Sequence, residues 1–231
     1  MTYKDIAKQF NIEIKNEKLF LTAFTHSSFT NEIKDGSEDY ERLEFVGDGV
    51  LALIIAVLIY QCYPTMNQGM MSKLRSCLVR SSSLANYARK YQFNNAIRIG
   101  HGEIASGGPN EKILEDVFEA FVGAVYLDQG FAFVKNMIES IFMEDIKNFD
   151  LDDLTDYKSR LQEDFQANSR GNVVYEVIEE SGLSQDKKFV VEVSVVLEDK
   201  TVLKLGRGEG RNKKAAQEAA AKDAYKRKAG Q

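Results

Sequence analysis

The sequence has few cysteines, no long apolar run and no excess of positive charge. Its two cysteines, Cys62 and Cys77, lack the spacing of a metal site and are too few for a disulfide framework. The unbroken apolar run Val50–Ile59 is shorter than the ~20 residues that a membrane helix needs. The segment Met1–Asp5 lacks the charged and then apolar layout of a signal peptide. We therefore expect a globular, cytoplasmic protein with no membrane partner.

The formal net charge of −5 is unevenly distributed along the chain. Residues 1–150 carry 15 basic and 20 acidic side chains, whereas residues 151–231 carry 15 of each. Within the second part, residues 204–228 carry nine basic and three acidic side chains. A basic patch confined to one segment is what binds phosphates, and the charge of the whole chain hides it.

Apolar residues at helical spacing predict an all-α first part, residues 1–148. The expected helices cover about residues 2–11, 16–24, 39–60, 70–79, 83–91, 111–128 and 130–147. Between them, Thr25–Glu32 is expected to be a polar turn, and the glycines of Gly100–Asn110 predict a loop.

The helix expected at residues 39–60 begins with three acids, Glu41, Glu44 and Asp48, whose spacing places them along one stripe. The apolar run that follows would bury this helix, and burying carboxylates is costly unless a cation lies among them. A hard metal ion such as Mg²⁺, which takes oxygen ligands, is one explanation. A solvated acidic first turn that faces the helix dipole is the other. The stretch alone leaves both open.

A second acidic pair lies on the helix expected at residues 111–128. Asp116 and Glu119 stand three residues apart in an otherwise apolar stretch, which is hard to explain as surface decoration. In the first acidic helix, Gly47 and Gly49 each cost about 1 kcal/mol relative to alanine. These glycines indicate a place where another helix, or a nucleic-acid backbone, comes close.

The periodicity changes after the acidic segment at residues 149–155, which is expected to be a linker. A helix at residues 157–167 precedes near-alternating segments at 173–179, 189–197 and 201–208, which predict three antiparallel strands. An alanine-rich helix follows at residues 213–228, with Asn212 as its N-cap. The order α-β-β-β-α over residues 156–231 predicts a small α+β domain.

Basic residues cluster where that last helix begins. Arg211, Lys213 and Lys214 lie at a helix N-terminus, which already favours anions and could bind phosphates. The alternative is that a lysine-rich helix is only solvated. The helix also has a face of small residues suited to close packing on a sheet: Ala215, Ala216, Ala219, Ala220 and Ala224.

The stretch Glu41–Leu51 closely resembles the signature of the ribonuclease III family, and Leu114–Ala124 resembles its second acidic motif. Thr25–Phe29 is similar to a third recurring segment of that family. Residues 156–228 resemble a double-stranded-RNA-binding domain, most clearly at Gly210–Ala220. The resemblance covers nearly the whole chain, with both domains in the family's usual order.

The resemblance implies an all-α endonuclease domain at residues 1–148, a linker at 149–155 and a double-stranded-RNA-binding domain at 156–231. It implies a homodimer that hydrolyses the phosphodiester bonds of double-stranded RNA with Mg²⁺, for which Mn²⁺ can substitute. The products would carry 5′-phosphate and 3′-hydroxyl ends. The cut would be staggered because the two sites of the dimer act on opposite strands. Structured precursors such as rRNA, and some mRNA, are the expected substrates.

Site residues follow from the resemblance, position by position. The metal-binding carboxylates would be those of Glu44, Asp48, Asp116 and Glu119. Asp48 and Glu119 would be the catalytic pair that is least replaceable, and Glu41 would be an auxiliary acid. Phe45 would enter a hydrophobic socket of the partner subunit at the dimer interface.

RNA contacts are expected in three segments of the second domain: Gln162 and Glu163 in its first helix, Ser184 and Gln185 in the loop after its first strand, and Arg211, Lys213 and Lys214 near its last helix. Such a domain binds largely by shape and phosphate contacts, so binding should be salt-sensitive and weakly sequence-selective.

The chain departs from the family's pattern at three places. Leu183 and Gln185 stand where a Pro and a His are usual, which should weaken the loop's RNA contact. Gln68 replaces a frequent acid, and Gly49 replaces Ala or Ser. A non-catalytic double-stranded-RNA-binding or scaffolding protein is the alternative function. The presence of all four carboxylates favours the enzyme.

Three other polar residues have structural interpretations. His26, beside two serines, is expected to be hydrogen-bonded rather than catalytic, and His101 to be exposed in its loop. Asp128 is expected to cap or close a helix end.

Overall fold

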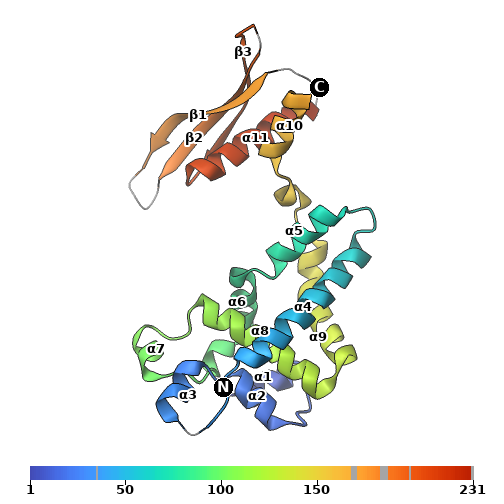
Figure 1. The fold of residues 1–231 in the computed structure, drawn as a ribbon, viewed down its shortest axis with the longest axis vertical. Coiled ribbons are helices and arrows are strands. Elements are labelled where there is room, and N and C mark those ends of the chain that lie inside the picture. Colours follow the sequence, from blue (N-terminus) through green and yellow to red (C-terminus); the bar gives the residue numbers. More distant parts are fainter. Residues whose placement is uncertain (35, 168–170, 183–186, 198, 230–231) are drawn as a thin grey trace. The chain divides into compact units, whose positions relative to one another are not determined.

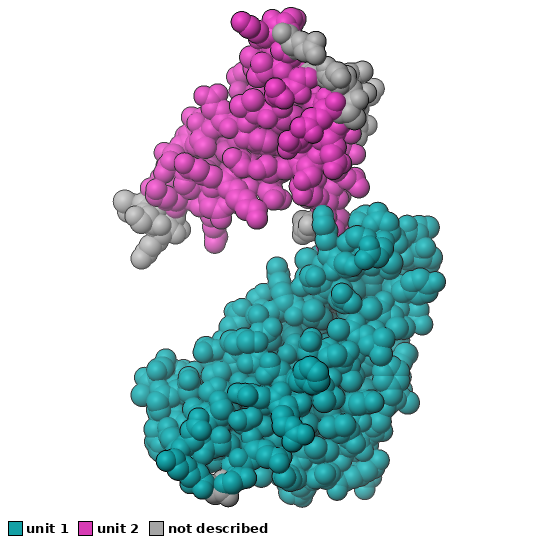
Figure 2. All heavy atoms as spheres, viewed as in Figure 1, with its two compact units in different colours: residues 1–150 teal, residues 151–231 magenta. Residues whose placement is uncertain are grey.

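The structure, a computed structural model, describes residues 1–34, 36–167, 171–182, 187–197 and 199–229. The chain forms two compact units, residues 1–150 and residues 151–231 (Figure 2). Unit 2 begins inside the acidic segment expected to be a linker, where Leu151–Leu154 forms a short 3₁₀ helix, η2.

Unit 1 is helical (Figure 1), which confirms the expected fold class. Its elements are α1 (Tyr3–Gln9), α2 (Glu17–Ala23), α3 (Ser27–Ile33), α4 (Glu41–Cys62), α5 (Gln68–Leu78), α6 (Ser81–Lys90), the 3₁₀ helix η1 (Phe93–Asn95), α7 (His101–Ala105), α8 (Glu111–Gln129) and α9 (Phe131–Lys147).

Two of these helices replace segments that were expected to be irregular. Helix α3 forms in place of the polar turn because the Nδ1 atom of His26 accepts the backbone N–H of Ser28 and caps the helix. Helix α7 occupies part of the expected loop. Its first backbone N–H, that of His101, donates to the carboxylate of Glu32 at 3.1 Å. The predicted turn and the predicted loop were therefore both partly wrong. In each case a polar side chain accepts a backbone N–H group at the start of a short helix, which would otherwise lack a hydrogen-bond partner.

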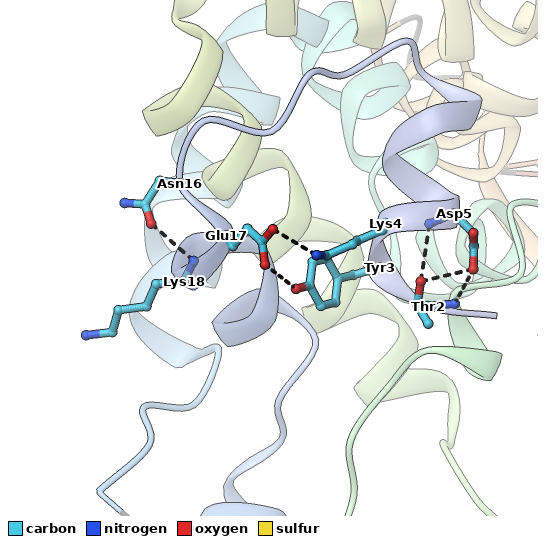
Figure 3. Close-up of polar contacts among 7 residues, drawn as sticks. All are labelled: Thr2, Tyr3, Lys4, Asp5, Asn16, Glu17 and Lys18. Carbon is cyan, nitrogen blue, oxygen red and sulfur yellow. Dashed lines mark hydrogen bonds and ion pairs between the residues drawn. The ribbon is translucent and has the colours of Figure 1, made fainter.

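The N-terminal helices are held by local caps (Figure 3). Thr2 and Asp5 form a capping box at the start of α1, and the Asn16 side chain accepts the backbone N–H of Lys18 at the start of α2. The Lys4 ammonium lies 2.8 Å from the Glu17 carboxylate and joins the two helices. Because both side chains are exposed, this pair orients the helices more than it stabilises them.

Helix α8 forms the centre of unit 1. Residues from Ile113 to Val125 are buried almost without interruption, including Asp116 and Glu119. The Phe121 ring lies 5.1–6.1 Å from the rings of Phe10, Phe20, Phe24 and Phe93. The packing of these five aromatic rings therefore fixes α8, and the buried side chains on it are held in place by the core.

Helix α4 crosses α8 at a pair of glycines. A Cβ atom added at Gly47 would lie 1.8 Å from the backbone oxygen of Glu119, and one added at Gly123 would lie 2.3 Å from that of Leu43. The expected close approach is thus confirmed for Gly47, and the neighbour is a helix. At Gly49 an added Cβ would meet no atom of the described residues within 4 Å, so no helix comes close there, and the approach of a nucleic-acid backbone stays a prediction.

By length and composition alone, α4 could also cross a membrane. It extends beyond the apolar run on which the sequence expectation rested, to 22 residues. Its buried side, which includes Leu51, Ile55 and Leu58, packs in the core of unit 1. Its first turns carry Glu41 and Glu44. Helix α4 therefore serves as a core helix of this unit.

Unit 2 has the predicted order α-β-β-β-α, which confirms the α+β class. Its elements are α10 (Tyr157–Ala167), β1 (Asn172–Ser181), β2 (Lys188–Val196), β3 (Val202–Gly210) and α11 (Lys213–Ala229). The strands form an antiparallel sheet in the order β1-β2-β3. Both helices pack on this sheet, with Tyr157 and Leu161 of α10 in the same core as Val191 and Val193 of β2.

The alanine face of α11 packs on glycines of β3, as expected. An added Cβ at Gly208 would lie 2.1 Å from the backbone nitrogen of Ala220, and one at Gly206 would lie 2.5 Å from that of Ala224. Ala215 is exposed but still lies beside β3, because a Cβ added at Gly210 would be 2.9 Å from its Cβ. Asn212 caps the helix as predicted: its side chain accepts the backbone N–H of Ala215 at 2.8 Å. The basic start of α11 is therefore held against the sheet.

Candidate functional site

A cavity of about 720 Å³ opens where α4 and α8 cross. It is lined by the six site residues that were predicted in unit 1: Glu41, Glu44, Phe45, Asp48, Asp116 and Glu119. Five further residues complete the lining: His26, Ser27, Tyr40, Lys112 and Glu115. The glycine crossing thus brings together two acidic motifs that are about seventy residues apart in the sequence.

Three of the acids form the centre of this cavity. Oxygen atoms of Glu44, Asp116 and Glu119 all lie within 4.8 Å of one another, and Asp116 and Glu119 are only 7% and 8% exposed. Two buried carboxylates and the half-buried one of Glu44, at this spacing, fit a hard cation such as Mg²⁺, which binds oxygen. Asp48 lines the same cavity one turn further along α4, but it is exposed and lies outside this group of three.

Two neighbours hold Asp116 in place. The Tyr40 hydroxyl donates to Asp116 Oδ2 at 3.2 Å, and the Lys112 ammonium lies 2.5 Å from Asp116 Oδ1. Lys112 also lies 3.3 Å from Glu115. Tyr40, Lys112 and Glu115 were not predicted from the sequence. Lys112 carried a signal, because it stands four residues before Asp116 on a helix, whereas the contact of Tyr40 comes from a distant segment.

The electrostatics of the cavity favour uptake of a cation or a proton. Burial, followed by repulsion from Asp48, Glu115 and Glu44, raises the pKa of Glu119 to about 8. Burial and the charge of Asp116 also raise the pKa of Glu44. Glu119 therefore holds a proton near neutral pH that a metal ion would displace.

The three structural interpretations of polar residues have different outcomes. His26 is hydrogen-bonded to Ser28, as expected, although it also lines the cavity. His101 is exposed, but it lies in α7 and contacts Glu32. Asp128 accepts the backbone N–H groups of Lys15 and Asn16, so it supports the start of α2 and not the end of its own helix.

The basic segment of unit 2 forms a second candidate surface. Arg211, Lys213 and Lys214 are exposed at the start of α11. A hollow of about 330 Å³ beside them is lined by Lys187, Lys188, Glu209, Gly210 and Arg211. Lys187, just before β2, and Lys188, its first residue, were not predicted. They pair with Glu180 and Glu209, and the local sequence does not indicate that they lie beside Arg211.

The remaining RNA-binding predictions divide into two groups. Gln162 and Glu163 are exposed on α10, where a ligand can reach them. Ser184 and Gln185, together with Leu183, lie outside the described residues.

An acid-lined cavity in a helical unit and a basic helix start in an α-β-β-β-α unit indicate a nuclease with a nucleic-acid-binding domain. Residues 16–146 match the family model described as ribonuclease-III-like, and residues 157–228 match the double-stranded RNA binding motif. A Ribonuclease 3 from Streptococcus sanguinis is 42% identical over 226 residues, which are 97% of this chain and 95% of that protein.

Solved structures show the same relationship. The nuclease domain of ribonuclease III from Campylobacter jejuni is similar with a TM-score of 0.57 and 31% identity, covering 64% of this chain and 97% of that one. A second structure of that domain, which concerns flexibility in a region involved in dimer formation, has a TM-score of 0.56 and 33% identity, covering 62% and 99%. The chain belongs to the ribonuclease III family. The expectation of a ribonuclease, a hydrolase, is thereby confirmed.

Proposed function

We propose that this chain is a Mg²⁺-dependent endoribonuclease that hydrolyses double-stranded RNA, with Mn²⁺ able to replace Mg²⁺. The observation that carries the proposal is the group of Glu44, Asp116 and Glu119, whose oxygen atoms lie within 4.8 Å of one another at the α4–α8 crossing. Burying these acids is costly without a cation, so their position supports a metal site. Asp48, which lines the same cavity, would complete the set.

The residues of the cavity divide the work as follows. When bound, Mg²⁺ supplies Lewis-acid chemistry, which activates a water nucleophile and neutralises charge on the reacting phosphate. Glu44, Asp48, Asp116 and Glu119 would hold the ion, and Asp48 and Glu119 are the proposed catalytic pair. Glu119, whose pKa of about 8 leaves it mostly protonated near neutral pH, would have to release its proton to serve as a ligand. Glu41, at the exposed rim, acts as an auxiliary acid.

The two units are proposed to have separate tasks. Residues 1–148 cut, residues 156–231 bind the duplex, and residues 149–155 join them. An acidic cavity repels a polyanion, so binding needs the exposed positive charge of Arg211, Lys213 and Lys214. Gln162 and Glu163 on α10 would contact a minor groove, where RNA presents its 2′-hydroxyl groups. Ser184 and Gln185 are proposed for the second groove.

We also propose that the enzyme is a homodimer. Phe45 is 83% exposed, and Leu53, Val57 and Tyr60 continue an exposed apolar stripe along the same face of α4. A stripe of this kind is typical of a protein interface. The Campylobacter jejuni nuclease domain has a region involved in dimer formation, which supports the proposal. We expect Phe45→Ala to shift the chain from dimer to monomer in sedimentation velocity. A variant that remains dimeric would exclude Phe45 as the interface anchor.

Two sites acting on opposite strands would give a staggered cut with 5′-phosphate and 3′-hydroxyl ends. The proposed substrates are structured precursors such as rRNA, and some mRNA, in the cytoplasm.

The deciding experiment measures cleavage and binding of a long, perfect RNA duplex by the full chain. We expect cutting with Mg²⁺ or Mn²⁺, none with EDTA, and none with Glu119→Gln, while gel-shift binding persists in all cases. Glu139→Gln, a change of the same charge on a partly exposed site of α9, is the control and should cut normally. If the wild-type chain binds the duplex but never cuts it, the protein is a double-stranded-RNA-binding scaffold and the proposal is wrong.

A further inference from the structure

The acid-lined cavity contains its own cation. Six of the lining side chains are acids, and among the described lining residues Lys112 is the single lysine or arginine. Its ammonium lies 2.5 Å from Asp116 Oδ1 and 3.3 Å from Glu115 Oε2. The contacted Asp116 oxygen is buried and belongs to a proposed metal ligand. Lys112 therefore neutralises an atom that a metal ion would also need.

The position of Lys112 in α8 is unfavourable for the helix itself. It is the second residue of α8, where the positive end of the helix dipole repels a cation. The order lysine then acid, four residues apart, is also the less stabilising arrangement of an ion pair on a helix. Ordinary helix stabilisation thus fails to explain this lysine, whereas six nearby acids do.

Glu115 completes the arrangement. It is half-buried, lies on the cavity wall beside Asp116, and is outside the group of three carboxylates that are close enough to share an ion. Its contact with Lys112 gives the ammonium a second carboxylate, which keeps it over the cluster. The side chain of Lys112 is 65% exposed, so it can leave towards solvent without disturbing the core.

We propose that Lys112 is a resident counter-cation that competes with the catalytic metal ion for Asp116. It stabilises the metal-free cavity and sets the metal concentration at which the site fills. This inference rests on the proposed function, because it assumes that Glu44, Asp116 and Glu119 bind a metal ion. Lys112 is a positioning residue, since it acts through Asp116.

The test measures Mn²⁺ binding to the full chain by the electron paramagnetic resonance signal of the free ion, so that it is independent of RNA cleavage. We expect Lys112→Met to lower the Kd for Mn²⁺ by about fivefold or more, because a positive charge beside the ion is removed. Lys112→Arg keeps the charge and should stay near the wild-type Kd. Lys135→Met is the matched control, since Lys135 also pairs with an acid four residues away, on α9. Its Kd should be unchanged.

Thermal unfolding provides a second readout. Without metal, Lys112→Met should unfold at a lower temperature than Lys135→Met, because the acids lose their counter-cation. Saturating Mn²⁺ should remove this difference. An unchanged or higher Kd in Lys112→Met, while the wild-type chain binds Mn²⁺ and Glu119→Gln does not, would overturn the role of Lys112 alone. If neither the wild type nor Lys112→Met binds Mn²⁺, the proposed function itself fails.

Discussion

Two close contacts, α4 on α8 in unit 1 and α11 on β3 in unit 2, depend on glycine but place charge differently. At the first contact, Gly47 and Gly123 bring two helices so near that acids from both meet in a buried cluster. At the second, Gly206 and Gly208 let an alanine face lie flat on the sheet, and the basic side chains remain outside. The same device therefore concentrates negative charge inside unit 1, where we propose a metal site, and displays positive charge on the outside of unit 2, where we propose that RNA binds.

The largest expected effect comes from breaking the first contact. In Gly47→Ala the new Cβ would collide with the backbone oxygen of Glu119. Because the clash is with backbone, a change of side-chain rotamer cannot relieve it. We expect a loss of at least about 3 kcal/mol in the free energy of unfolding of unit 1. Urea denaturation measures this. Gly49→Ala is the matched control, because it points into open space and should stabilise α4 by up to about 1 kcal/mol. Equal losses in both variants would contradict the assigned crossing.

Breaking the second contact should separate the two functions. Gly208→Ala places a Cβ 2.1 Å from the backbone nitrogen of Ala220, and we expect unit 2 to lose about 2–3 kcal/mol. Duplex binding in a gel shift should weaken strongly, while Mn²⁺ binding to the cavity of unit 1 persists. Loss of Mn²⁺ binding in this variant would show that the cavity depends on unit 2.

The acid cluster of unit 1 should make stability depend on pH. The folded-state pKa of Glu119 is raised to about 8 from an ordinary value of 4.5, so the folded chain holds a proton that the unfolded chain loses. Stability from this proton is fully present below pH 4.5 and is lost as pH rises through 8. The free energy of unfolding of the metal-free wild type should therefore fall as pH rises from 5 to 9. We expect Glu119→Gln to make this fall smaller by roughly 2 kcal/mol. Urea denaturation of the wild type and of Glu119→Gln at pH 5, 7 and 9 measures this difference. If the stability of both proteins changes equally with pH, the prediction is contradicted.

The smallest expected effect concerns the exposed lysines at the start of α11. Replacing Lys213 and Lys214 with glutamine should weaken duplex binding about tenfold and lower the salt dependence of the binding constant by about 1–2 phosphate contacts. Binding measured at several salt concentrations gives both values. Lys204→Gln is the control, because Lys204 pairs with Glu192 on the sheet and should contribute little. An unchanged salt dependence in the double variant would remove these lysines from the interface.

Helical spacing predicted which acids share a face, but it could not predict where the partner helix crosses. Helical spacing does not distinguish Glu41, Glu44 and Asp48, whereas in the structure it is Glu44 whose oxygen atoms lie within 4.8 Å of those of Asp116 and Glu119, and Asp48 lines the same cavity. Whether Asp48 binds the ion as the resemblance implies remains a prediction.

Contacts between segments that are distant in the sequence could not be predicted either, because they depend on how the helices pack. Tyr40 bonds to Asp116 across 76 residues, and nothing in the local pattern around either residue indicates the pair. Helix α7 was missed similarly, because its first turn is completed by Glu32, which is 69 residues away. Local propensity thus predicted the long helices and the strands. Short helices and supporting contacts depended on the assembled fold.

At the α4–α8 crossing, the backbone and the side chain of Glu119 have separate roles. The backbone of Glu119 contacts Gly47, whereas its carboxylate belongs to the cavity. If Glu119 acts as we propose, substitution of its carboxylate abolishes the chemistry and leaves the crossing intact, whereas substitution of Gly47 removes both. A descendant of this protein that became a pure RNA-binding scaffold would therefore keep Gly47 and Gly123 after its acids had drifted. In such a lineage the glycines would be the surviving trace of a former enzyme.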